Sequence, residues 1–282
     1  MSAFYLISII LGVAFQNVVR KPYTDKTQGK GVYFFGFLVS LAAMIFFIAT
    51  SGGLKWNPGL ILYGAFFAIA YATATVAGTV AVSCGSLSIT TLIISYSLMI
   101  PAVYGLIFLK DPISFGLIPG LVLLMISLYL INTRGQGAKV TLKWVVAVFL
   151  GFFGNGMCSV VQKMQQVKFE GSYKNEFMIV ALAMVTVFLG VLAFVRERKE
   201  IKSYAKAGWH MALLCGIVNG VVNLFVMILS GIMPVSIMFP MVSAGGIIVT
   251  YLVSRFYYKE KLTKTQFLGF IIGIASVVFL NL

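Results

Sequence analysis

Charged residues interrupt this chain so rarely that the uncharged stretches between them limit what it can fold into. A helix needs about 20 apolar residues to cross the hydrocarbon core of a bilayer. The long uncharged intervals measure 19, 24, 54, 22, 19, 19, 48 and 18 residues and lie at 1–19, 31–54, 56–109, 112–133, 144–162, 177–195, 207–254 and 265–282. The six shorter intervals therefore predict one membrane-spanning helix each.

The two longest intervals predict two helices each. At about 1.5 Å per residue a helix over residues 56–109 would be roughly 80 Å long, far longer than a bilayer is thick. We expect breaks at residues 83–86 and 230–234, where serine, glycine and proline suit a turn followed by a new helix. The total is ten helices, so the sequence predicts an all-α polytopic membrane protein.

Composition excludes the main alternatives. The chain is 60% hydrophobic and 10% charged, whereas soluble domains are about 45–50% apolar and about 25% charged. A soluble core cannot bury this much apolar surface, which excludes a water-soluble enzyme and a disordered chain. The net charge of +14 lies between the apolar runs and not on a folded polar face, so no nucleic-acid partner is expected.

The order of single and double intervals occurs twice along the chain. Residues 16–21 (QNVVRK) resemble residues 158–163 (CSVVQK), and residues 109–114 resemble residues 258–263. These matches predict two five-helix repeats, 1–138 and 139–282. Because five is odd, the second repeat would enter the membrane from the opposite side, and transporters with such inverted repeats bind substrate near the midplane.

Basic residues predict the orientation. Sixteen of the 21 lysines and arginines lie on one side of the predicted membrane, in the loops after helices 1, 5, 7 and 9. The positive-inside rule places these loops in the cytoplasm and both termini outside. The expected location is a bacterial inner membrane.

The two repeats also carry an acidic turn after their fourth helices, Leu109-Lys110-Asp111 and Tyr258-Lys259-Glu260. With ten helices in two halves, the chain resembles the drug/metabolite transporter superfamily, EamA-type permeases, whose turn is usually Leu-Gly-Glu followed by a basic residue. Here lysine replaces the glycine, and aspartate replaces the first glutamate. The resemblance implies a transporter whose helices 1, 3, 4, 6, 8 and 9 line a central cavity. It also implies cytoplasmic termini, opposite to the charge count, and it does not imply a substrate.

Acidic residues are missing from the predicted spans, and no residues show the spacing of metal ligands. All seven aspartates and glutamates lie in or beside loops, which argues against exchange of cations for protons through a buried carboxylate. The three cysteines are far apart and there is a single histidine, so we expect no metal site and no cofactor.

Uncharged polar side chains within the spans are therefore the candidates for binding a substrate. Asn155, Ser159 and Gln162 share one helix face, as do Asn219 and Asn223. Amides are costly in a bilayer unless paired and usually face the bundle interior, although such pairs could equally hold helices together. The predicted substrate-binding residues are Gln16, Asn17, Tyr71, Thr75, Ser95, Tyr96, Asn155, Ser159, Gln162, Asn219, Asn223 and Ser236.

These features predict a secondary transporter for a small organic metabolite, such as an amino acid or another zwitterion, that works by alternating access. Two alternatives stay open: a flippase for a lipid-linked head group, and an exporter of drugs or quaternary ammonium ions. No acid pair or nucleophile with a base is visible, so an enzyme is not expected. Because one chain contains both repeats, a monomer is expected to function in the lipid bilayer.

Overall fold

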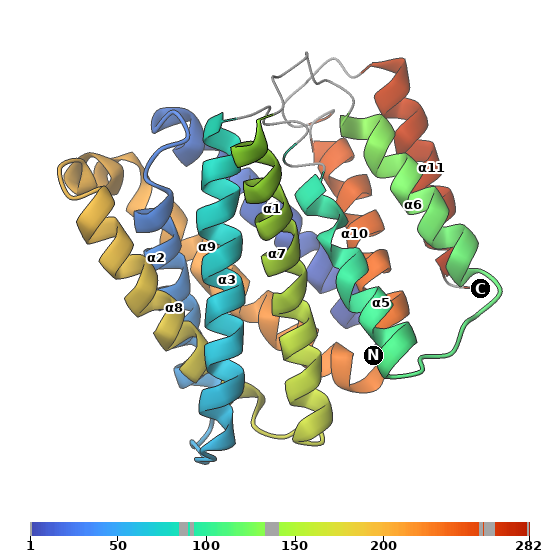
Figure 1. Ribbon diagram of the computed structural model, residues 1–282, viewed down its shortest axis with the longest axis horizontal. Coiled ribbons are helices and arrows are strands. Elements are labelled where there is room, and N and C mark those ends of the chain that lie inside the picture. The colour runs from blue at the N-terminus through green and yellow to red at the C-terminus, as the bar shows by residue number, and fades with distance from the viewer. Residues whose placement is uncertain are drawn as a thin grey trace. The chain divides into compact units, whose positions relative to one another are not determined.

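The described chain is helical. The structure, a computed structural model, describes residues 2–84, 90, 93–132, 141–253, 256, 263–280 and 282 (Figure 1). Its helices are α1 (Ser2–Lys26), α2 (Val32–Thr50), α3 (Gly59–Cys84), the 3₁₀ helix η1 (Tyr96–Leu98), α5 (Met99–Phe108), α6 (Leu117–Asn132), α7 (Leu142–Lys168), α8 (Lys174–Arg196), α9 (Ile201–Ile232), α10 (Val235–Leu252) and α11 (Lys264–Leu280).

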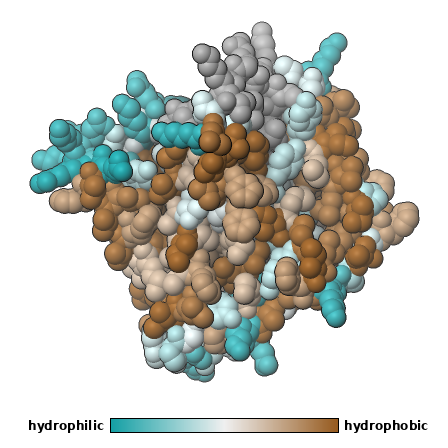
Figure 2. Space-filling model, in the orientation of Figure 1, coloured by the Kyte–Doolittle hydropathy of each residue, from teal (hydrophilic) through white to brown (hydrophobic). Residues whose placement is uncertain are grey.

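Six of these helices are long and apolar enough to cross a membrane: α1, α2, α3, α7, α8 and α9. Four shorter apolar helices cover Ile93–Phe108, Leu117–Leu130, Val235–Gly246 and Lys264–Leu280. Brown, apolar side chains cover much of the visible face in Figure 2, and teal, hydrophilic side chains gather at its margins. The chain is therefore an integral, multi-pass membrane protein.

The break predicted at residues 230–234 is confirmed. Helix α9 ends at Ile232 and α10 begins at Val235, directly after Pro234, whose fixed φ suits the start of a helix. Helix α3 ends at Cys84 within the other predicted break. Gly85 and Ser86 lie outside the described residues, as does the second acidic turn at residues 258–262.

The described chain packs as two compact units, and each combines segments from both ends of the sequence. Unit 1 contains Met1–Ile10, Thr73–Val160 and Ile232–Leu282, and unit 2 contains Leu11–Ala72 and Val161–Gly231. Helices α1, α3 and α7 each contribute to both units. The units follow packing and not the sequence repeats, so the boundary near residue 138 stays a prediction.

In unit 2, α2 packs against α8 (Figure 1). Ser40 of α2 accepts a hydrogen bond from the hydroxyl of Thr186 of α8 at 2.9 Å, and both side chains are buried. A polar pair inside an apolar helix interface is costly to separate in lipid because neither partner finds water there. This bond therefore holds α2 and α8 in one register.

The same two helices are joined by a carboxylate at their ends. Glu197 follows α8 and accepts hydrogen bonds from the backbone N–H groups of Tyr33 and Phe34 at 3.1 and 2.8 Å. These N–H groups belong to the first turn of α2 and have no partner within their own helix. The negative carboxylate also interacts favourably with the positive end of the α2 dipole.

In unit 1, α6 packs against α11, and α5 packs against α10 (Figure 1). Asp111 follows α5 and accepts a hydrogen bond from the backbone N–H of Ser236 in the first turn of α10, at 3.0 Å. The acid of the first predicted turn thus caps the N-terminus of a neighbouring helix. Buried serines join α6 to α11, because Ser127 donates to the Gly269 carbonyl at 2.7 Å and Ser276 donates to the Gly120 carbonyl at 2.8 Å.

Candidate functional site

Four predicted site residues of unit 2 form a continuous chain of side-chain amides. Gln162 of α7 donates through Nε2 to Oδ1 of Asn223 at 2.8 Å, and Asn223 donates through Nδ2 to Oδ1 of Asn219 at 2.9 Å. Asn219 donates in turn to Oε1 of Gln16 on α1 at 3.2 Å. The amide chain, defined as Gln16, Asn219, Asn223 and Gln162, thus connects α1, α9 and α7.

The amide chain is partly shielded and keeps unused hydrogen-bonding capacity. Gln162 is buried, and the other three side chains are half-buried. A side-chain amide offers two donor hydrogens and two acceptor lone pairs. Among the described residues the bonds of Gln162 Nε2 go to Asn223 and, at 3.8 Å, to the sulfur of Met178, while no hydrogen bond to Gln162 Oε1 is found. This site can therefore both donate to and accept from a small polar molecule.

A basic residue, Lys163, follows Gln162 in the sequence of α7. The Lys163 ammonium group donates to the Ser230 carbonyl at 2.6 Å. Ser230 is seven residues beyond Asn223 on α9, a spacing of about two turns that puts both on one face of that helix. One face of α9 therefore carries the two neutral amides of Asn219 and Asn223 and, two turns further on, the Ser230 carbonyl that accepts a hydrogen bond from Lys163.

Two glutamines of α7 extend the buried polar region and were missed by the sequence analysis. Gln165 and Gln166 are almost fully buried. Gln166 donates to Gln165 at 2.5 Å, and Gln165 donates to the Ser172 carbonyl at 2.9 Å, while Oε1 of Gln166 has no partner in the part of the chain that the structure describes. The sequence places both glutamines near the end of a predicted span. An amide there is normally expected to reach water, so this position did not mark them as buried.

In unit 1 another amide of α7 meets a serine. Asn155 donates through Nδ2 to the hydroxyl oxygen of Ser97 at 2.6 Å. Ser97 belongs to η1, immediately before α5, and lies four residues before Pro101. Proline cannot continue the α-helical hydrogen bonds, which explains the tighter turn here. Tyr96 of the same turn donates to the Met125 carbonyl of α6 at 2.8 Å.

The other predicted site residues have different surroundings among the described residues. Asn17 is exposed, and Tyr71 stacks on Phe67 with ring centroids 6.1 Å apart. The Thr75 carbonyl accepts a hydrogen bond from Thr79 within α3. The other three are Ser95, which is half-buried, Ser159, which is buried, and Ser236, which is fully buried and whose hydroxyl has no hydrogen-bond partner among the described residues.

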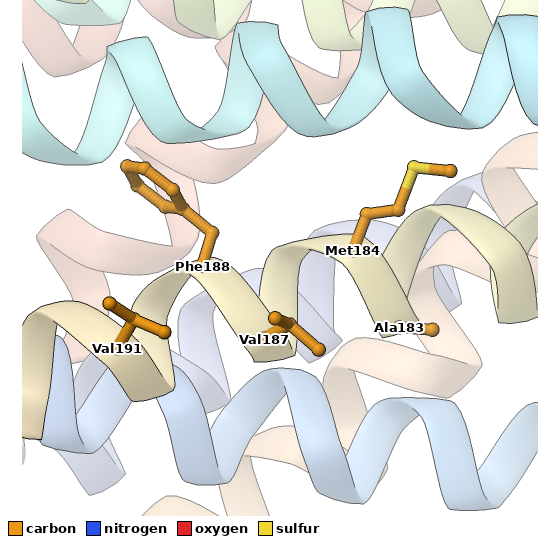
Figure 3. A pocket seen from close by; sticks show the side chains of 5 residues that line it. All are labelled: Ala183, Met184, Val187, Phe188 and Val191. Carbon is orange, nitrogen blue, oxygen red and sulfur yellow. The ribbon is translucent and has the colours of Figure 1, made fainter.

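A surface groove of about 540 Å³ in unit 2 has a different chemistry (Figure 3). All of its lining residues belong to α8 and are apolar: Ala183, Met184, Val187, Phe188 and Val191. Nothing in this lining can orient a polar solute, which needs a few placed donors and acceptors. The amide chain is therefore the better candidate for a substrate site.

The described residues contain no group of three or more histidine, cysteine, aspartate or glutamate side chains that could hold a metal ion. The hydrogen-bonding groups of the amide chain are neutral, and they could bind a solute without the large desolvation cost of a buried charge. Its chemistry is recognition by hydrogen bonds.

A solved structure shares the fold of this chain. The chain is similar over 100% of its length, and over 98% of the other chain, to a crystal structure with a TM-score of 0.77 and 10% sequence identity. This likeness shows the fold alone. No curated protein matches the chain.

The family comparison covers half of the sequence. The EamA-like transporter family matches residues 142–282, from the first residue of α7 to the end of the chain. This family is part of the drug/metabolite transporter superfamily, to which the acidic turns and helix pattern of the sequence pointed. The chain belongs to the EamA-like transporter family.

Proposed function

We propose that this transporter moves a small zwitterionic metabolite, such as an amino acid, and that the amide chain binds it. The observation that carries the proposal is the meeting of Gln16, Asn219, Asn223 and Gln162 from three helices. Amide carbonyls would accept hydrogen bonds from the substrate ammonium group, and amide N–H groups would donate to its carboxylate. Lys163, next to Gln162, supplies a positive charge that attracts the carboxylate.

Transport would proceed by alternating access in ten spans arranged as two inverted repeats, 1–138 and 139–282. Three helix pairs support this architecture, namely α2 with α8, α5 with α10 and α6 with α11. Each pair joins the helices of equal rank in the two predicted repeats, as a pseudo-two-fold axis would. A substrate shifts such an equilibrium only as far as it binds one state better than the other. A monomer would suffice.

The test begins with thermal unfolding of the purified protein against amino acids, quaternary ammonium ions, sugar phosphates, nucleosides and polyprenyl phosphates. A ligand at a hundred times its Kd should stabilise the protein by about 2.7 kcal/mol. We expect stabilisation by zwitterions. Stabilisation confined to quaternary ammonium ions or polyprenyl phosphates would instead favour a drug exporter or a flippase.

Uptake of the stabilising zwitterion into proteoliposomes then tests the site. Asn219→Ala with Asn223→Ala should lower the uptake rate at low substrate concentration by about tenfold or more, since each lost hydrogen bond contributes roughly 0.5–1.5 kcal/mol. Asn17→Ala is the matched control, because Asn17 is an exposed amide on α1 outside the amide chain. Unchanged uptake in the double variant, or an equal loss in the control, would overturn the proposal.

A further inference from the structure

One face of α8 is apolar and exposed over the C-terminal half of the helix. The groove lined by Ala183, Met184, Val187, Phe188 and Val191 lies on this face, and Figure 3 shows Met184 and Phe188 projecting side by side from the helix. Val187 and Val191 are 68% and 57% exposed. Spacings of three and four residues keep the groove residues on one side of the helix. In a bilayer this face contacts hydrocarbon chains.

The same face ends in a guanidinium group. Beyond the groove, Phe194 and Val195 are 58% and 66% exposed, and the Cζ atom of Arg198 lies 5.0 Å from the centre of the Phe194 ring. Helix α8 ends at Arg196, and Arg198 lies just beyond it, with its guanidinium group over the ring of Phe194, which is three residues after Val191. The apolar groove thus leads to a positive charge at the helix end.

The surroundings of Arg198 are also positive. Arg196, Lys199 and Lys202 are exposed within four residues of it. The two acids of this segment are already engaged, because the Glu197 carboxylate accepts two N–H groups of α2 and the Glu200 carboxylate accepts the Tyr204 hydroxyl. The basic segment, residues 196–202 from the end of α8 to the first turn of α9, therefore carries four basic and two acidic side chains and is net positive.

We propose that α8 binds one anionic phospholipid, with an acyl chain in the groove and the phosphate at Arg198. Only an amphiphile with an anionic head group can bind both to the apolar groove and to the basic segment. A soluble anion makes no apolar contact with the groove, and a neutral lipid has no net charge to pair with the basic side chains. Arginine binds phosphate oxygens through paired, charge-assisted hydrogen bonds. The groove residues are separate from the amide chain, so this lipid site does not depend on the transported substrate.

The experiment measures lipid retention on the intact, full-length protein by native mass spectrometry, with phosphatidylglycerol and phosphatidylcholine of equal chain length. Arg198→Gln should lower the apparent affinity for phosphatidylglycerol about fivefold and leave phosphatidylcholine unchanged, since one basic residue near an anionic head group contributes about that factor. Val187→Trp, which fills the groove, should lower retention of both lipids.

Two exposed positions outside the proposed site serve as controls. Lys168→Gln removes a cation at the end of α7, and Ile45→Trp enlarges a side chain on α2 that is 55% exposed. Neither should change retention of either lipid. Equal retention of both lipids by the unmodified protein would overturn the proposal, as would an Arg198→Gln effect no larger than that of Lys168→Gln. If the unmodified protein is a dimer and Val187→Trp dissociates it, the groove binds a second chain and not a lipid, and the proposal is also overturned.

Discussion

At the residue scale, neighbouring polar side chains of this protein can have very different contacts. Gln16 and Asn17 are neighbours on α1, yet Gln16 accepts a hydrogen bond from Asn219 while Asn17 is exposed. Successive residues of a helix point about 100° apart, so one neighbour can join a polar network that the other cannot reach.

Glu197 is a residue whose charge state should affect stability. Its carboxyl lies outside the membrane-spanning helices, and burial raises its pKa above the ordinary value, although the N–H groups of Phe34 and Tyr33 act in the opposite direction. A raised pKa in the folded state means that stability is greatest below the ordinary pKa of 4.5 and falls as pH rises through the raised value.

We therefore expect the melting temperature of the unmodified protein, relative to Glu197→Gln, to fall as pH rises from 4.5 towards neutrality. Glutamine does not titrate, so the difference between the two melting curves isolates this one group. Thermal unfolding in detergent across this range is the measurement. A difference that is flat or rises with pH would show that burial does not control the ionisation of Glu197.

At the element scale, close contact between helices depends on single glycines. A Cβ atom on Gly216 of α9 would lie 2.6 Å from the Val39 carbonyl oxygen and 2.5 Å from the Ala42 Cβ of α2. Small residues allow helices in a membrane to approach closely and pack by van der Waals contact. Gly246 of α10, in contrast, has nothing within 4 Å of such a Cβ.

Alanine at these two positions should therefore have opposite effects. Gly216→Ala should destabilise the protein by about 1–3 kcal/mol, because a backbone carbonyl must move to make room. Gly246→Ala should be neutral or stabilise by up to about 1 kcal/mol, since alanine favours the helix. Thermal unfolding of both variants in one detergent compares them directly, and equal melting temperatures would contradict the close contact of α2 and α9.

At the scale of the whole molecule, the family and the fold are shown by separate comparisons, while the orientation in the membrane is a prediction. The family match covers residues 142–282, and the likeness to a solved structure covers the entire chain. Sixteen of 21 basic residues predict that the loops after the first, fifth, seventh and ninth predicted helices are cytoplasmic. The segment between α8 and α9, with Arg198 and Lys199, belongs to one of these predicted loops.

This orientation can be measured with single cysteines in a variant from which Cys84, Cys158 and Cys215 have been replaced. A membrane-impermeant maleimide should label Ser2→Cys and Leu282→Cys in intact cells. Ten spans place both termini on the same side of the membrane, and the basic loops predict that this side is the outside. Ser203→Cys should react only after the membrane is permeabilised. Labelling of Ser203→Cys in intact cells would reverse the orientation, and labelling of only one terminus would contradict an even number of spans.

Hydropathy along the chain was sufficient to predict the helices, because the cost of placing a residue in hydrocarbon is local and adds up along the sequence. It identified the break before Pro234 and the amides that must avoid lipid. It could not decide which of these amides meet. Asn219 and Gln16 are 203 residues apart, and Glu197 and Tyr33 are 164 apart. Helical periodicity specifies a face, whereas the neighbour of that face depends on how distant helices pack.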